Sequence, residues 1–192
     1  MKEIVIVKAG GTNFASIEDA LERLHCKFFY AKSNADILNA SKILLPGVGS
    51  MQNAQIEEFR SIFQTLKQPV LGICLGMQLL FEKSAECKEK LGLGVLKNEV
   101  VAFQSDVISP HTGWNNLKFT TQQSIFAESE GGFVYFTHSF FVPKMQHTTA
   151  FCNYGTNQVS AIIEKENFYG FQFHPEKSGL CGEKLLEKFL AI

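Results

Sequence analysis

The chain has 192 residues, of which 45% are hydrophobic, and its formal net charge at pH 7 is −1. This length fits a single domain over residues 1–192, with a core large enough to need no disulfide or metal staples. The near-neutral charge gives no global electrostatic attraction to nucleic acid or to an anionic membrane. We therefore expect a protein that recognises its partners locally and binds neither nucleic acid nor membrane.

The cysteines are five in number, at positions 26, 74, 87, 152 and 181. An odd number without C-x-x-C or Cys/His ligand spacing favours neither a disulfide framework nor a zinc site, so no metal is expected. We also expect the protein to use no cofactor. The N-terminus enters a strand pattern without the apolar core of a signal peptide, and no apolar run approaches membrane-spanning length. These features predict a cytoplasmic protein.

The first half of the chain alternates between short apolar runs and helical apolar spacing. The runs predict strands at residues 4–7, 27–30, 43–45 and 70–73. The spacing predicts helices at residues 14–24, 36–40, 51–66 and 75–81. Alternating strands and helices predict an α/β fold with a parallel, doubly wound sheet, whose ligand crevice lies at the carboxyl ends of the strands.

The second half is richer in strand patterns. Strands are predicted at residues 95–103, 116–119, 133–136, 149–154, 158–163 and 168–173, before a closing helix at residues 180–190. An antiparallel extension of the same sheet accounts for them most simply. No repeat, low-complexity stretch or interdomain linker interrupts the pattern.

Cys74 lies in the sequence G-I-C-L-G at residues 72–76, between a predicted strand and a predicted helix. In a nucleophile elbow, flanking glycines prevent clashes around a strained turn that exposes the reactive side chain. Free cysteines at the ends of core strands are also often buried only for packing. The motif alone therefore leaves catalysis and core packing both open.

A cysteine nucleophile needs a general base, and the base needs a group that orients it and stabilises its cation. Residues 172–176 supply both groups. In extended backbone, residues two apart project to the same side, so Glu176 can reach His174 while Pro175 restricts the backbone between them. His174 taken alone would more often be structural, so the hypothesis of a catalytic triad depends on all three residues.

A tetrahedral oxyanion would need hydrogen-bond donors beside the nucleophile. The backbone N–H of Leu75 is one natural donor, and the glycine-flanked Val48 can bring a second. A glycine-rich loop before a helix could instead cradle phosphate. The P-G-V-G-S sequence at residues 46–50 lacks the G-x-G-x-x-G spacing and the P-loop lysine, which favours the oxyanion interpretation.

Three motifs, at residues 46–49, 72–78 and 173–178, resemble in sequence and order those of triad-type (class I) glutamine amidotransferases. The resemblance spans nearly the whole chain and implies a three-layer α/β/α, flavodoxin-like glutaminase. It implies that Cys74 attacks the side-chain amide of L-glutamine and that His174 protonates the departing ammonia. Water would then hydrolyse a glutamyl thioester.

Within that family, residues 111–115, 135–140 and 177–178 are similar to the glutaminase subunits of imidazole glycerol phosphate synthases. This similarity implies a heterodimer with a (βα)8-barrel cyclase subunit, to which ammonia passes in histidine biosynthesis. We expect a path between the two active sites that excludes water, because ammonia released into bulk water would be protonated and lost. The similarity further implies substrate binding by Gly49, Gln78, Ser139 and Phe140.

The same similarity places Trp114 and Lys177 at the subunit interface and Asn13 in a loop near it. From the sequence alone, Trp114 could equally be a core residue, and Lys177 an ordinary surface lysine. A second histidine, His138, has no carboxylate at the spacing seen after His174. We assign His138 a structural role or a role in the substrate loop.

The chain departs from the family in the loop after its first strand. Residues 8–13 read K-A-G-G-T-N, where the family typically has D-Y-G-x-G-N. An alternative is therefore a diverged paralogue that supplies ammonia to a related barrel synthase outside histidine biosynthesis, for example in surface-sugar modification. A non-catalytic regulatory module with the same fold, or a cysteine peptidase or chaperone-like hydrolase on a similar sheet, is also conceivable.

We expect weak glutamine hydrolysis by the isolated chain, because an unformed oxyanion hole would protect the cell from wasting glutamine. Peptide flips are sterically easy at glycine-flanked bonds. The Gly47–Val48 peptide is the candidate for such a flip.

Overall fold

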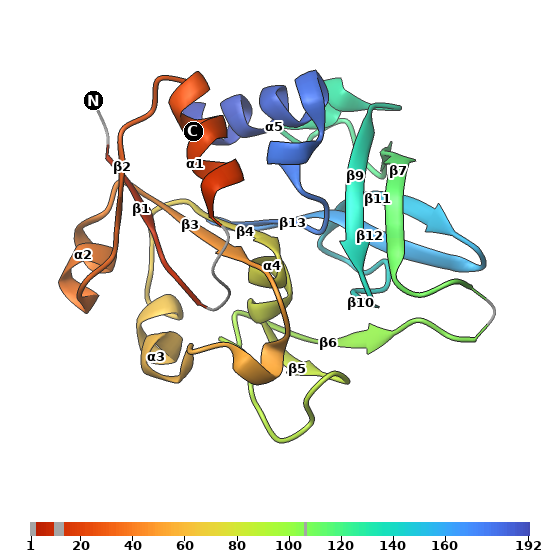
Figure 1. Cartoon of the computed structure of the whole chain (residues 1–192), viewed down its shortest axis with the longest axis horizontal. Helices are drawn as coiled ribbons and strands as arrows, with labels where there is room; N and C mark the ends of the chain where they lie inside the picture. The colour runs from red at the N-terminus through yellow and green to blue at the C-terminus, as the bar shows by residue number, and fades with distance from the viewer. Residues whose placement is uncertain (1–2, 10–13, 106) are drawn as a thin grey trace.

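The computed structural model describes residues 3–9, 14–105 and 107–192. An eight-stranded sheet forms its centre (Figure 1). In spatial order the strands are β2 (Phe28–Tyr30), β1 (Ile4–Ile6), β3 (Lys42–Gly47), β4 (Val70–Cys74), β13 (Phe168–Phe171), β12 (Asn157–Lys165), β11 (Thr148–Tyr154) and β8 (Lys118–Phe119). The strands from β2 to β13 are parallel, and β12, β11 and β8 are antiparallel to their neighbours. A mostly parallel sheet with an antiparallel extension is thereby confirmed.

Two apolar cores lie on opposite faces of this sheet, because successive residues of a strand point to opposite sides. Ile4 and Ile6 of β1 belong to the core beneath α1 (Ala15–Arg23) and α5 (Gly179–Ala191). Val5 belongs to the other core, which packs against the remaining helices, α2 (Asn34–Asn39), α3 (Arg60–Phe63) and α4 (Leu75–Leu79). The result is the three-layer α/β/α arrangement visible in Figure 1.

Two small sheets stand outside the main one. Strand β6 (Leu96–Ala102) lies between β5 (Phe81–Ser84) and β10 (Phe140–Phe141), and β7 (His111–Asn116) pairs with β9 (Phe133–His138). The predicted strands at residues 95–103 and 133–136 therefore form, but they do not extend the main sheet. Strand β7 was not predicted as a strand because its sequence, H-T-G-W-N-N, has no apolar alternation; its pairing with β9 makes it a strand.

The predicted long helix at residues 51–66 is wrong. Only the 3₁₀ turns η1 (Met51–Asn53) and η2 (Glu57–Phe59) and the short α3 form there. The backbone is extended at Ala54, and the next residue, Gln55, donates its N–H to the carbonyl oxygen of Ala9 over 2.7 Å. A hydrogen bond to another segment thus replaces one within the helix. The helix predicted at residues 75–81 is also shorter, because β5 begins at Phe81.

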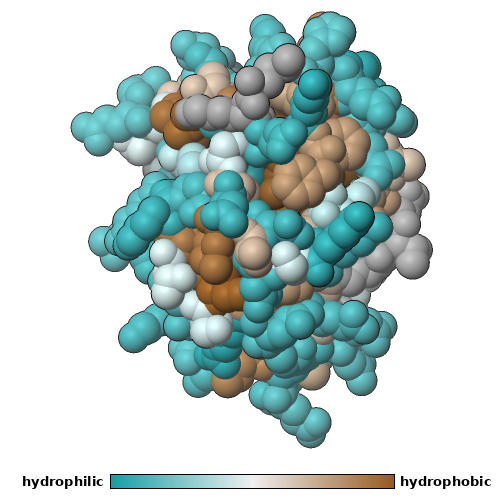
Figure 2. Space-filling model, turned by 90° about the vertical axis from the view of Figure 1, so that its left-hand side faces the viewer, coloured by the Kyte–Doolittle hydropathy of each residue, from teal (hydrophilic) through white to brown (hydrophobic). Residues whose placement is uncertain are grey.

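Strand β2 forms one edge of the main sheet, on the face shown in Figure 2. Apolar side chains gather there among polar ones, and Phe29 and Leu38 are exposed large apolar residues of β2 and α2. This edge strand has only three residues, which limits the template it offers to another chain. The other 3₁₀ turns are η3 (Ala127–Ser129) and η4 (Pro175–Lys177). Among the described residues, no helix combines the length and the apolar character that a membrane span requires.

Candidate active site

Cys74 occupies a sharp turn between β4 and α4. Its backbone has φ 53° and ψ −109°, in the positive-φ region that non-glycine residues rarely adopt. Strained backbone at a strand-to-helix turn is the geometry of a nucleophile elbow. The side chain is only 8% exposed, less than the elbow motif predicted, but it lines a cavity of about 410 Å³. Cys74 is thus largely buried but faces the cavity.

The glycines around Cys74 are required by close backbone contacts. A Cβ atom on Gly76 would lie 1.6 Å from the carbonyl oxygen of Leu45 in β3, and one on Gly72 would lie 2.6 Å from the carbonyl oxygen of Gly76. Both distances are far shorter than atoms tolerate. The absence of these side chains therefore lets α4 start directly against the sheet and hold Cys74 at the strand end.

Replacing Gly76 with alanine should lower the free energy of unfolding by about 3 kcal/mol or more, at or beyond the upper end of overpacking costs. The added methyl group would meet the Leu45 carbonyl, which cannot move without separating β3 from β4. Urea unfolding measures the change. Gly131→Ala is the control: its φ is +73° and its surroundings are open, so only about 1–2 kcal/mol of backbone strain is expected. Equal costs for both variants would contradict the steric explanation.

His174 and Glu176 form the second part of the site. The Nδ1 atom of His174 lies 2.7 Å from Oε1 of Glu176, and both side chains are almost fully buried. Glu176 reaches back from the 3₁₀ turn η4, so the pairing is confirmed but does not arise from the extended backbone that the sequence suggested. The other oxygen, Oε2, has no hydrogen-bond partner among the described residues.

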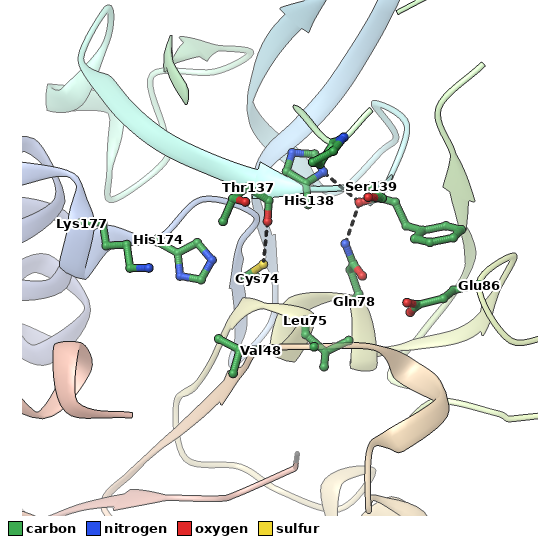
Figure 3. A pocket seen from close by; sticks show the side chains of 13 residues that line it. Val48, Cys74, Leu75, Gln78, Glu86, Thr137, His138, Ser139, His174 and Lys177 are labelled. Atoms are coloured by element: carbon green, nitrogen blue, oxygen red, sulfur yellow. Dashed lines mark hydrogen bonds between the residues drawn. The ribbon is translucent and has the colours of Figure 1, made fainter. Parts of the chain in front are cut away.

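The backbone of His174 is fixed to β9. Its N–H donates to the carbonyl oxygen of Tyr135 over 2.9 Å. The hydroxyl of Ser178 donates to the carbonyl oxygen of His174 over 2.6 Å and accepts the N–H of Tyr135 over 2.9 Å. These bonds hold the imidazole at the cavity wall, where it faces Cys74 (Figure 3).

The pKa of His174 reflects opposing influences. Burial alone would lower it, but interactions with Cys74 and Glu176 outweigh burial and raise the pKa well above its usual range. These interactions therefore favour the positively charged form of the imidazole. An imidazolium between the sulfur of Cys74 and the carboxylate of Glu176 can stabilise a thiolate nucleophile and later give a proton to the leaving group.

Both predicted oxyanion donors lie at the cavity beside the sulfur. Gly47 is the partner of Cys74 in the β3–β4 register, so Val48 follows directly at the end of the neighbouring strand. Leu75 is the first residue of α4, where a backbone N–H has no acceptor within its own helix. Val48 and Leu75 both line the cavity (Figure 3). The strand ends therefore bring the two predicted donors together at Cys74.

The predicted substrate residues form another part of the wall: Gly49, Gln78, Ser139 and Phe140. The amide nitrogen of Gln78 donates to the carbonyl oxygen of Phe140 over 2.7 Å and to Oε1 of Gln172 over 3.0 Å. Both amide hydrogens of Gln78 are thus taken by the protein. Its Oε1 atom is the part left to accept a hydrogen bond from a ligand.

Two polar residues of the site were missed by the sequence analysis. Glu86 lines the cavity, and its Oε2 accepts the N–H of Met51 over 2.8 Å. Gln172 is fully buried, and its amide nitrogen lies 3.9 Å from the sulfur of Cys74. Gln172 is the first residue of the predicted segment 172–176 but was given no role there, whereas Glu86 lies among charged residues that resemble any solvated turn.

The predicted interface residues have different outcomes. Trp114, on β7, is 56% exposed and packs edge-on against Tyr135, so the alternative of a core residue is wrong. Lys177 lies in η4 at the wall of the cavity (Figure 3). Asn13 lies outside the described residues. The exposed Trp114 and the cavity are linked through Tyr135, whose carbonyl oxygen accepts the N–H of His174.

Comparisons with known proteins agree with this geometry. The sequence model of class-I glutamine amidotransferases matches residues 5–192. The chain is 38% identical, over 100% of its length and 98% of the relative, to "Imidazole glycerol phosphate synthase subunit HisH 1" of Vibrio vulnificus (strain YJ016). It is 40% identical, over 98% of its length and 99% of the relative, to the HisH subunit of Escherichia coli (strain K12).

Solved structures share the fold at lower identity. A putative GMP synthase subunit of Thermoplasma acidophilum has a TM-score of 0.72 at 17% identity, over 100% of this chain and 93% of that one. The glutaminase domain of Trypanosoma brucei CTPS, with bound acivicin, has a TM-score of 0.69 at 15% identity, over 100% of this chain and 94% of that one. These structures show the fold, and the match of the family model over residues 5–192 shows that the chain belongs to the class-I glutamine amidotransferase family.

Proposed function

We propose that this protein is the glutaminase subunit of an imidazole glycerol phosphate synthase, which hydrolyses L-glutamine and delivers ammonia to a (βα)8-barrel cyclase subunit in histidine biosynthesis. The observation that carries the glutaminase chemistry is a single cavity that joins Cys74, His174, Val48, Leu75 and Gln78. Its volume of about 410 Å³ suits a small ligand such as one amino acid. Full-length identities of 38–40% with HisH subunits support the choice of synthase.

In the proposed reaction, the thiolate of Cys74 attacks the carboxamide carbon of glutamine and forms a C–S bond. The carbonyl electrons move to the oxygen, which accepts hydrogen bonds from the N–H groups of Val48 and Leu75. When the carbonyl reforms, His174 gives its proton to the amide nitrogen, the C–N bond breaks, and the nitrogen leaves as ammonia. Water then attacks the thioester, His174 takes a proton from it, and glutamate leaves with the thiolate restored.

The other end of the substrate would be held by the opposite wall. The carboxylate of Glu86 supplies a negative charge for the α-ammonium group of glutamine, and Oε1 of Gln78 supplies an acceptor. The wall at Ser139 and Phe140 would accommodate the α-carboxylate side. This assignment orients the carboxamide toward Cys74.

A partner surface would lie beside the cavity. Trp114 and Phe133 are large aromatic residues exposed on β7 and β9, and exposed aromatic residues are typical anchors of interfaces. Lys177 connects this surface with the cavity wall. We infer that the cyclase docks here, that ammonia leaves along this side, and that docking favours the Val48 N–H orientation needed for the oxyanion.

The test is to mix the chain with a histidine-pathway cyclase. Glutamine turnover should be weak in the isolated chain and should rise by about tenfold or more with the cyclase and its ribulosyl phosphate substrate, as expected for an allosteric coupling. Trp114→Ala should weaken the complex about 30-fold, since an interface tryptophan contributes about 2 kcal/mol or more. Full-rate turnover by the isolated chain would contradict partner activation.

Absence of both complex and stimulation would favour the diverged paralogue. A feature of the chain supports that alternative: Lys8, at the start of the atypical loop, holds its ammonium group 3.8 Å from the ring centre of Tyr30. A cation occupies a position where the family typically has an acid. Stimulation by a different barrel synthase, and not by the histidine-pathway cyclase, would then identify the partner.

A further inference from the structure

Two buried histidines lie behind the substrate wall. His111 of β7 and His138 of β9 face each other in the antiparallel register and are 3% and 7% exposed. Nδ1 of His111 is 3.1 Å from Nε2 of His138, and Nδ1 of His138 is 2.8 Å from the carbonyl oxygen of Phe140. The mechanism above uses neither imidazole, although His138 lines the cavity and His111 contacts His138 from behind.

Both imidazoles are uncharged at neutral pH. Burial lowers the pKa of His111 to about 4. Burial and then the neighbouring His111 lower the pKa of His138 to about 3. Aromatic rings enclose the pair: Phe136 and Tyr154 stack on His111, and Phe103 packs against both imidazoles.

The contacts fix which nitrogens carry protons. The carbonyl oxygen of Phe140 can only accept, so Nδ1 of His138 must carry its proton. In a neutral imidazole the other nitrogen, Nε2, then has none and accepts from Nδ1–H of His111. Nε2 of His111 is left as an acceptor, 3.5 Å from the amide nitrogen of Asn115. The donors thus all point in one direction, toward Phe140.

The Phe140 carbonyl is where this chain of hydrogen bonds meets the active site. It also accepts a hydrogen bond from the amide of Gln78 (Figure 3). The second amide hydrogen of Gln78 goes to Oε1 of Gln172. The amide nitrogen of Gln172 in turn lies 3.9 Å from the sulfur of Cys74. One set of polar contacts therefore runs from β7, across the substrate wall, to the nucleophile.

We propose that His111 and His138 are positioning residues for glutamine: as a pair of Nδ1–H imidazoles they hold the Phe140 carbonyl, and through it the Gln78 amide, in the orientation that binds substrate. This role rests on the proposed glutaminase function. A hydrogen-bonded chain with fixed donors has a single low-energy arrangement, because reversing one member leaves two donors or two acceptors facing each other. The Phe140 carbonyl and the Gln78 amide are thereby held in the substrate-binding arrangement before glutamine binds.

Kinetics with two variants of His138 test the role. His138→Phe removes both nitrogens and should raise the KM for glutamine about tenfold, with kcat of the cyclase complex changed by less than about threefold. His138→Asn retains an amide N–H near the position of Nδ1 and should restore the KM to within about threefold of the wild type. His147→Phe, a half-buried histidine that does not line the cavity, is the control and should leave the KM unchanged. Equal effects of the phenylalanine and asparagine variants, or an effect on kcat alone, would overturn the proposal.

Nitrogen-15 NMR of the histidine side chains provides a readout independent of glutamine turnover. At pH 7 both imidazoles should be neutral with the proton on Nδ1, and a charged ring or an Nε2–H form of either would overturn the proposed chain. Calorimetric measurement of glutamine affinity separates the proposed glutaminase function from the positioning role. If the wild type binds glutamine but does not hydrolyse it, the glutaminase function fails. The positioning role then stands if His138→Phe weakens binding and His138→Asn does not, and it fails otherwise.

Discussion

Replacing Cys74 with alanine is expected to lower the kcat for glutamine hydrolysis by about 10⁴-fold or more, because no other nucleophile can form the thioester. Cys74 holds the strained backbone of the elbow, with Val48 and Leu75 beside it and His174 facing it. The measurement is glutamate release by the chain in complex with its cyclase. A glutamine-analogue electrophile should add one label to the wild type and none to Cys74→Ala, as read by mass spectrometry.

The other cysteines provide controls for this result. Cys87 is half-buried and does not line the cavity, so Cys87→Ala should react and turn over glutamine as the wild type does. Cys152 is buried in the core, and burial raises the pKa of its thiol to about 12, so it remains protonated and unreactive. Labelling of Cys74→Ala would contradict the assigned nucleophile. Failure of the wild type to react even with its partner bound would favour a non-catalytic module.

The parts of the site that the sequence predicted are those defined by local chain geometry. Cys74 lies between glycines at a strand end, and His174 and Glu176 are two residues apart, so a few neighbouring residues specify each motif. Their meeting follows from the parallel sheet, because β3, β4 and β13 are adjacent and all end at the same edge. Alternating strands and helices were enough to predict that edge.

The parts that could not be predicted depend on contacts between distant segments. Residues 51–66 have helical apolar spacing, yet Ala54 and Ile56 are buried on a backbone that neighbouring loops hold out of the helix. Glu86 follows β5, and that strand exists only through pairing with β6. Pairing of this kind leaves no periodicity in the residues themselves. Intrinsic propensity is a weak prior that such tertiary contacts override.

Replacing Glu176 with glutamine should lower kcat by about 10²- to 10⁴-fold with little change in the KM for glutamine. The amide keeps the shape of the side chain but removes the charge that stabilises the imidazolium, and it can present a donor to Nδ1 of His174 and so favour the wrong tautomer. Glutamine itself is held by other residues of the cavity, so kcat should fall while the KM changes little. Stopped assays of glutamate release over a range of concentrations measure both.

The pH profile gives the variant a second signature. Glu176 is one of the groups that raise the pKa of His174, so its removal lowers that pKa and the imidazolium loses its proton at a lower pH. The imidazolium gives its proton to the amide nitrogen that leaves as ammonia, and the alkaline limb of the kcat profile should therefore move to lower pH.

Glu86→Gln is the matched control, because it makes the same chemical change at a carboxylate that lines the cavity itself, whereas Glu176 contacts His174. It should raise the KM about tenfold or more through loss of the charge opposite the α-ammonium group, and it should leave the pH limits of kcat in place. If both variants lowered kcat, loss of either negative charge would act through the general electrostatics of the site. That outcome would contradict a specific role of Glu176 at His174. A pH shift confined to Glu176→Gln is the outcome that only a direct partner of His174 can produce.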